Sequence, residues 1–184
     1  MSTTNTAPDP EALVALLDVI DNYPGAAALR ARSIELLAAP PGAVIVDVGC
    51  GAGRAVAEMA EQGWDGLGID LDEHMLTIAR RRWPHCRFEK ADAAELPLAD
   101  HSVQGYRAEK VFHDIADPTA ALTEAHRVLT PGGRIVLIGQ DCSLVKSSVG
   151  IRFVGRGQVA GSGLGGVPRA SSVESAWWCV ELPC

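Results

Sequence analysis

The residues best suited to chemistry stand in and shortly after the segment VIVDVGCGAGRA, which covers residues 44–55. Gly49, Gly51 and Gly53 follow an apolar run there, and glycine allows a tight turn and lets a ligand approach the backbone itself. Asp70 ends the next apolar run, GLGID, roughly 20 residues further on, the interval at which a carboxylate accepts hydrogen bonds from both hydroxyls of a ribose. The pattern predicts a nucleoside held between glycine backbone and a carboxylate.

The glycine spacing and Asp47 indicate which groups the bound nucleoside carries. The glycines are spaced Gly-x-Gly-x-Gly, not the Gly-x-Gly-x-x-Gly of dinucleotide folds, which disfavours a bound pyrophosphate. Asp47 stands inside the predicted strand, two residues before the first glycine, and its carboxylate would repel a pyrophosphate. A ligand with an ammonium and a sulfonium suits this carboxylate, either directly or through water and loop amides.

Helix-like and strand-like patterns alternate along the chain. Apolar residues at helical spacing predict two helices between residues 10 and 39, separated at Pro24-Gly25. We then expect strands at 44–48, 66–70, 87–90, 103–108 and 134–139, helices at 54–62, 73–83 and 118–129, and a turn at Pro131-Gly132-Gly133. This alternation predicts an α/β fold whose mostly parallel sheet is covered by helices on both faces.

Composition limits the classes of protein and partner. A chain of 184 residues fits one domain, and no apolar run approaches the length of about 18 residues that a membrane span needs. The net charge of −7 argues against a nucleic-acid partner. The first ten residues carry no export signal, and the five cysteines show no metal-type pairing, so we expect a cytoplasmic protein without a metal site.

Five segments resemble the class I S-adenosylmethionine-dependent methyltransferases. VDVGCGAGR resembles motif I, GIDLDEHML the strand 2 motif, and EKADAAELPLAD the strand 3 motif. RAEKVFHDIADP and EAHRVLTPGGRIVLIGQD resemble the strand 4 and strand 5 segments of the subgroup that includes ubiquinone/menaquinone methyltransferases and many small-molecule tailoring enzymes. The match runs from about residue 26 to residue 141 and implies a Rossmann-like, doubly wound sheet with strand order 3-2-1-4-5.

The resemblance also implies a site for the cofactor S-adenosyl-L-methionine. It assigns Asp70 to the ribose, Leu71 and Met75 to the neighbourhood of the adenine, Asp92 to the adenine amino group and the Ala93 amide to a ring nitrogen. The expected residues of the methionine side are Asp47, Gly49, Cys50, Gly51, Gly53 and, at the end of strand 4, Arg107. Nothing near Cys50 in the sequence would activate its thiol, so it is best read as a small tolerated side chain.

Several of these residues have structural alternatives. Asp92 could cap a helix after strand 3, and Met75 could fill the core. Tyr23 and Arg30, in the N-terminal helices, are expected to be solvated.

His113 is the candidate catalytic residue, because a histidine titrates near neutral pH and can act as a general base. The subgroup more often has histidine at the position of Asp114, and an aspartate where this chain has Gln104, so the histidine is displaced here. Methyl transfer can proceed without a base, since the sulfonium leaving group supplies the driving force and positioning does much of the rest.

Residues 142–184 depart from the family pattern. We therefore divide the chain into a short disordered lead (1–9), a cofactor-binding domain (10–141) and an atypical tail (142–184). The tail could be a divergent form of the last two strands, with IRFVGRGQVAG as one and SAWWCVEL as the other, or a linker or insertion. It could also be an out-of-frame translation, the explanation we favour because the composition changes abruptly at one point.

The expected activity is methyl transfer to an O, N or C nucleophile of a small molecule. The alternative is a cofactor-binding protein without turnover, which the unusual tail suggests. A nicotinamide-dependent oxidoreductase is disfavoured by the glycine spacing and by the lack of a Tyr-x-x-x-Lys pair. The sequence gives no indication of the particular acceptor or the oligomeric state.

Overall fold

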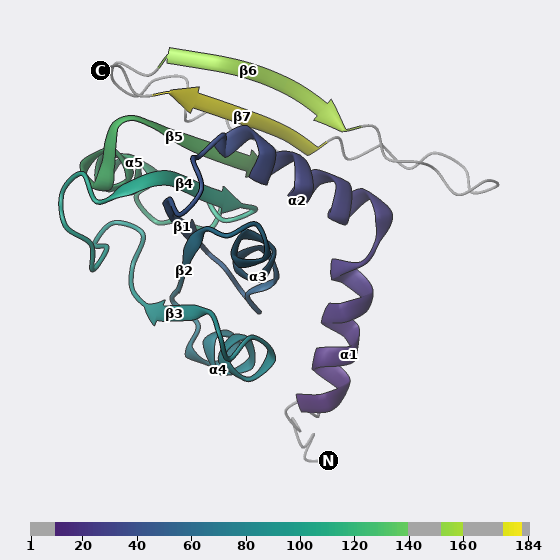
Figure 1. Ribbon diagram of the computed structural model, residues 1–184. Helices are drawn as coiled ribbons and strands as arrows, with labels where there is room; N and C mark the ends of the chain where they lie inside the picture. The colour runs from purple at the N-terminus through teal and green to yellow at the C-terminus, as the bar shows by residue number, and fades with distance from the viewer. Residues whose placement is uncertain (1–9, 140–151, 160–174, 182–184) are drawn as a thin grey trace.

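A seven-stranded sheet forms the centre of the computed structural model, which describes residues 10–139, 152–159 and 175–181 (Figure 1). Its strands are β1 (Val44–Val48), β2 (Asp65–Asp70), β3 (Arg87–Lys90), β4 (Val103–Glu109), β5 (Leu129–Gly139), β6 (Arg152–Val159) and β7 (Ser175–Glu181). They lie in the order β3-β2-β1-β4-β5-β7-β6. The first five are parallel, so the predicted order 3-2-1-4-5 is confirmed.

Helices cover both faces of this sheet, as expected. The helices are α1 (Pro10–Asp21), α2 (Pro24–Leu37), α3 (Arg54–Glu61), α4 (Glu73–Arg82) and α5 (Pro118–Val128). The apolar side of α5 packs with β1, β4 and β5 in one core, whereas α2, α3 and α4 pack in a second core that includes Ile45 and Val136 (Figure 1). Because both faces are covered, the central strand β1, VIVDV, is apolar at every position except Asp47.

Two helices, α4 and α5, begin at aspartate caps that the sequence provides. Asp72 accepts a hydrogen bond from the His74 amide at 2.8 Å at the start of α4, and Asp117 accepts bonds from the Thr119 and Ala120 amides at 3.0 Å at the start of α5. These bonds fix the residue at which each of the two helices begins.

The predicted turn at residues 131–133 lies inside a strand. β5 already begins at Leu129, which is paired with Val103, and the register then moves to Gly105↔Arg134. Gly132 has a φ of +78°, a conformation that lets the intervening residues bulge out before the chain returns to the ladder. The prediction that the helix extends to residue 129 was therefore wrong by one residue.

The last two strands of the fold, which the sequence left open, are formed by the two segments named as candidate strands. β7 pairs antiparallel with β5, with Val136 opposite Cys179, and β6 pairs antiparallel with β7. This arrangement is the one expected if the tail contains a divergent form of the family's last two strands. β7 covers the edge of β5. The rest of the tail lies outside the described residues, and a shifted reading frame stays a prediction about the gene.

Among the described residues, no single helix has the length and apolar content of a membrane span. Only α1 and α2 taken together pass that test, and they are bent by 69° where they meet.

Candidate functional site

Two cavities open at the carboxyl ends of the central strands, and Gly49 lines both. The β2-side cavity, of about 330 Å³, is lined by residues 69–71 at the end of β2, by residues 91–94 after β3 and by residues 114–117 before α5. The α1-side cavity, of about 210 Å³, is lined by the glycine loop, by Asp47 and Arg107 and by residues of α1 and α2. They lie where the strand order reverses around β1, the position at which doubly wound sheets bind ligands.

The three glycines of the loop have different surroundings. A Cβ on Gly49 would lie 2.0 Å from Val111 Cγ2, and one on Gly53 would lie 2.5 Å from Phe88 Cζ, so protein packs against both. Gly51 has a φ of +52° and no atom within 4 Å of where its Cβ would stand. Gly51 is therefore the position of the loop at which a ligand can approach the backbone.

Asp70 holds this loop to the end of β2. Its Oδ2 accepts a hydrogen bond from the Gly51 amide at 2.8 Å, and its Oδ1 accepts one from the Asp72 amide at 2.9 Å. Each carboxylate oxygen has a second lone pair, so the two bonds leave acceptor capacity for further donors such as hydroxyls. Asp70 also lines the β2-side cavity.

The structure brings most of the residues expected near an adenine into the β2-side cavity. Leu71, Asp92 and Ala93 line it, with Leu71 exposed at its mouth and Ala93 buried. Asp92 Oδ1 accepts a bond from the Ala94 amide at 2.9 Å within a turn, and no helix begins there, so the helix-cap alternative was wrong. Met75 lies half-buried in the first turn of α4 and is not among the residues that line this cavity.

An ion pair buried under the α1-side cavity was not foreseen from the sequence. Arg107 Nη1 donates to Asp47 Oδ1 at 2.7 Å, and both side chains are at most 3% exposed. Arg107 also donates to the carboxylate of Glu109 and to the Ser33 hydroxyl of α2. Asp47 of β1 and Arg107 of β4 are register partners, so the ion pair could have been predicted only from the register of these two strands. The charge of Asp47 is thus already compensated within the protein.

Burial and charge act in opposite directions on this pair. Burial raises the pKa of the Asp47 carboxyl above its ordinary value, although Arg107 opposes the shift. Burial acts to lower the pKa of Arg107, but the carboxylates of Asp47 and Glu109 outweigh it, and the pKa lies above its ordinary value. Arg107 therefore stays charged.

A second cluster joins α2 to α3 beside the same cavity. Arg30 donates to both carboxylate oxygens of Glu58, at 2.7 and 2.9 Å, and Arg54 donates to Glu58 at 2.8 Å. Burial raises the pKa of Glu58, but the hydrogen bonds from Arg30 and Arg54 outweigh it and leave that pKa below its ordinary value. Arg30 is only 6% exposed, so the expectation that it is solvated was wrong, whereas Tyr23 is exposed as expected.

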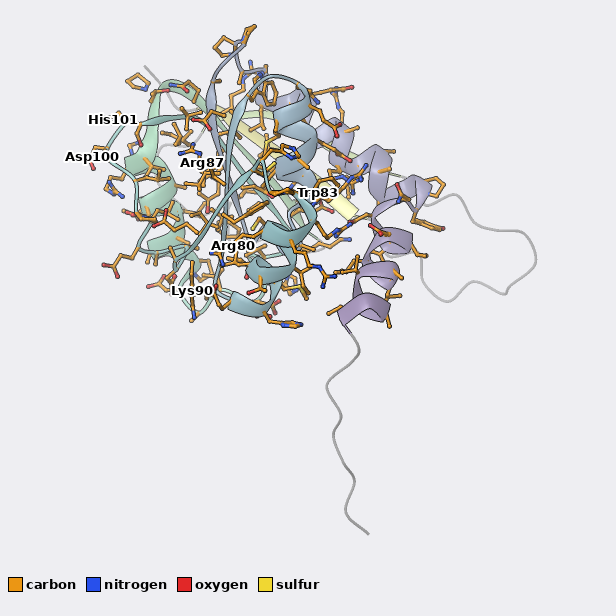
Figure 2. All side chains as sticks on the ribbon, turned by 60° about the horizontal axis from the view of Figure 1, so that its bottom comes forward. Arg80, Trp83, Arg87, Lys90, Asp100 and His101 are labelled. Atoms are coloured by element: carbon orange, nitrogen blue, oxygen red, sulfur yellow. The ribbon has the colours of Figure 1, made fainter. Side chains whose placement is uncertain are left out.

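Charged contacts also hold α1 over the α1-side cavity. Arg82, at the end of α4, pairs with Asp18 and, at 3.2 Å, with Asp21 of α1. The next residue, Trp83, labelled in Figure 2, donates from its indole nitrogen to the Ala52 carbonyl of the glycine loop at 3.1 Å. The guanidinium of Arg82 lies 5.4 Å from the centre of the Trp83 ring. The side chains of Arg82 and Trp83 therefore connect α1 to the glycine loop.

The candidate catalytic residue stands outside both cavities. The His113 side chain is 58% exposed, and its Nε2 lies 3.2 Å from the carboxylate of Asp114, which does line the β2-side cavity. Gln104 accepts a hydrogen bond from the Val44 amide at 2.7 Å and so joins β4 to β1.

Cys50 is a buried residue of the loop. It belongs to the core that α2, α3 and α4 form on one face of the sheet, and it also lines the α1-side cavity. Burial raises the pKa of its thiol well above the ordinary value, which keeps the thiol protonated and unreactive.

Comparison with known proteins identifies the family. A family model described as "Methyltransferase domain" matches residues 46–137. The chain is 32% identical over 108 residues to a demethylmenaquinone methyltransferase of Beutenbergia cavernae, covering 59% of this chain and 45% of that protein. The chain spans 38 to 47% of the length of the curated relatives it matches.

Solved structures agree. An S-adenosylmethionine dependent methyltransferase from Mesorhizobium loti superposes with a TM-score of 0.57 at 33% identity, over 65% of this chain and 55% of that one. A SAM dependent methyltransferase from Aquifex aeolicus, at 18% identity, shares the fold over 96% of this chain and all of its own, with a TM-score of 0.70. The chain belongs to the class I S-adenosylmethionine-dependent methyltransferases.

Proposed function

We propose that the protein transfers a methyl group from S-adenosyl-L-methionine to an O, N or C nucleophile of a small molecule. The observation that carries the proposal is the open backbone position at Gly51, which is hydrogen-bonded to Asp70 where two cavities meet. The net charge of −7 supports a small acceptor rather than a nucleic acid.

The residues around the two cavities fit the cofactor. Asp70 would hold the ribose through its remaining lone pairs, and Leu71, Asp92 and Ala93 would surround the adenine in the β2-side cavity. The glycine loop, with Asp47 and Arg107 beneath it, would receive the methionine part in the α1-side cavity. When bound there, the cofactor supplies a methyl group activated by its sulfonium.

The contribution of the chain itself is to position the reactants and exclude water. No histidine is among the described residues that line the two cavities, and His113 is mostly exposed. Holding two reactants in line converts a bimolecular step into an effectively unimolecular one, without a proton-transfer residue. The proposal therefore assigns no general base.

The names of the relatives suggest which class of methyl acceptor to test first. Some are demethylmenaquinone methyltransferases, which supports testing quinols first. Leu17 and Ile20 of α1 add apolar surface to the α1-side cavity, which suits an acceptor with an apolar body.

The test is an assay with S-adenosylmethionine labelled in its methyl group and a panel of quinols, phenols and amines. We expect labelled product with at least one class and none without an acceptor. Calorimetric binding of S-adenosylhomocysteine together with no transfer to any panel member would favour the alternative, a cofactor-binding protein without turnover. Absence of binding would contradict both.

A further inference from the structure

One cationic residue lines the α1-side cavity from the turn that follows β4. Lys110 has a φ of +56°, a conformation that residues other than glycine rarely adopt. Its amide donates to the Ile138 carbonyl of β5 at 2.7 Å, which fixes the chain at this point. Lys110 lines the cavity, and its side chain is 52% exposed. A strained backbone thus places a lysine at the mouth of the site.

The other cations around this cavity are committed to carboxylates. Arg30 and Arg54 bond to Glu58 at 2.7 and 2.8 Å, and Arg107 bonds to Asp47 at 2.7 Å. The ion pair of Lys110 that the described residues provide is with Glu109, whose Oε1 lies 3.9 Å from Nζ, beyond hydrogen-bond range. Lys110 therefore differs from the three arginines.

Each acid that lines the cavity also accepts a hydrogen bond from an arginine. Asp47 and Glu109 both accept from Arg107, and Asp21 pairs with Arg82. A lysine ammonium has three hydrogen-bond donors, and its pairing here uses none of them at hydrogen-bond distance. The group that would complete this arrangement is a negatively charged oxygen brought by a ligand.

We propose that Lys110 binds an oxyanion in the α1-side cavity. This rests on the proposed function, which supplies two sources of that chemistry: the carboxylate of the methionine part of the cofactor and an ionised oxygen of the methyl acceptor. In either case Lys110 sets which ligands the cavity accepts.

The experiment compares wild type, Lys110→Gln and Lys110→Arg with three probes. S-Adenosylhomocysteine carries the carboxylate, and 5′-methylthioadenosine lacks the amino-acid part; both are titrated calorimetrically. 4-Nitrophenolate, titrated by absorbance into protein saturated with S-adenosylhomocysteine, stands for an acceptor oxyanion. We expect Lys110→Gln to weaken one oxyanion probe by about tenfold or more, with methylthioadenosine unchanged and Lys110→Arg close to wild type.

The matched control is Arg81→Gln, which removes the positive charge of an exposed residue in the last turn of α4, outside both cavities. Weaker S-adenosylhomocysteine binding identifies the cofactor carboxylate, and weaker nitrophenolate binding alone identifies an acceptor oxygen. The proposal is overturned if neither oxyanion probe responds more than in Arg81→Gln, or if methylthioadenosine weakens equally. Failure of wild type to bind S-adenosylhomocysteine would instead reject the proposed function itself.

Discussion

The three glycines of the loop have different structural roles, although their spacing in the sequence does not distinguish them. Their spacing predicted that a ligand meets backbone here, but their separate roles depend on side chains from distant segments. Val111 closes the space at Gly49 and Phe88 closes it at Gly53, so Gly51 alone of the three faces open space. Neither Val111 nor Phe88 could be assigned to the loop before the strands were placed.

Gly51→Ala should weaken cofactor binding by more than its effect on stability explains. A left-handed φ costs a residue with a Cβ about 1–2 kcal/mol, and here the new methyl group would also fill the space left for a ligand. We expect a loss of about tenfold or more in affinity for S-adenosylhomocysteine, measured by calorimetry beside urea unfolding.

Gly42→Ala is its control, because Gly42 has a φ of +76°, nothing within 4 Å of its Cβ position and no place in either cavity. It should lose similar stability and keep its affinity. Equal affinities in the two variants would show that the open space at Gly51 is not used.

At the level of elements, the alternating pattern was sufficient to predict β1 to β4 and the helices α3, α4 and α5, in their order along the chain. What it missed depends on contacts between elements far apart in sequence. The Asp47–Arg107 pair follows from the register of β1 against β4, and the burial of Arg30 follows from Glu58 of α3. β5 starts early because a bulge at Gly132 brings Leu129 into the ladder.

Charged contacts contribute to the position of helix α1. Leu16 and Val19 are 55% and 71% exposed, so this helix buries little apolar surface there. Its anchors are the bonds from Arg82 to Asp18 and Asp21 and from Arg30 to the Asp21 carbonyl. A segment held in this way opens more readily than one held by a core.

Arg82→Gln should therefore loosen α1. We expect amide hydrogen exchange in residues 10–21, followed by mass spectrometry, to become faster by about tenfold, corresponding to roughly 1.4 kcal/mol. Arg80→Gln on the same helix removes a half-exposed pair with Glu73 and should leave that exchange unchanged. Similar exchange in both variants would mean that α1 is held by other contacts.

At the scale of the whole molecule, the site lies where the strand order reverses around β1. β2 and β3 lie to one side of β1, and β4 and β5 lie to the other. Residues at the ends of β2 and β3 line one of two cavities, residues at and after the end of β4 line both, and the cavities meet at Gly49. The alternation of strands and helices predicted a mostly parallel sheet, for which right-handed crossovers leave few topologies, and the family resemblance implied the strand order. Its last two strands were less predictable, because residues 142–184 lack the family pattern and β7 and β6 become recognisable only through pairing with β5.

The central claim is that Asp70 and the glycine loop together hold the nucleoside of the cofactor, and a calorimetric titration with S-adenosylhomocysteine tests it most directly. Asp70→Asn is compared with Asp65→Asn, the same change at the other end of β2, where Asp65 makes an exposed pair with Arg87. We predict unchanged affinity for Asp65→Asn and a loss of about 1.5–3 kcal/mol, roughly tenfold to a hundredfold, for Asp70→Asn. Equal affinities of wild type and Asp70→Asn would contradict the account.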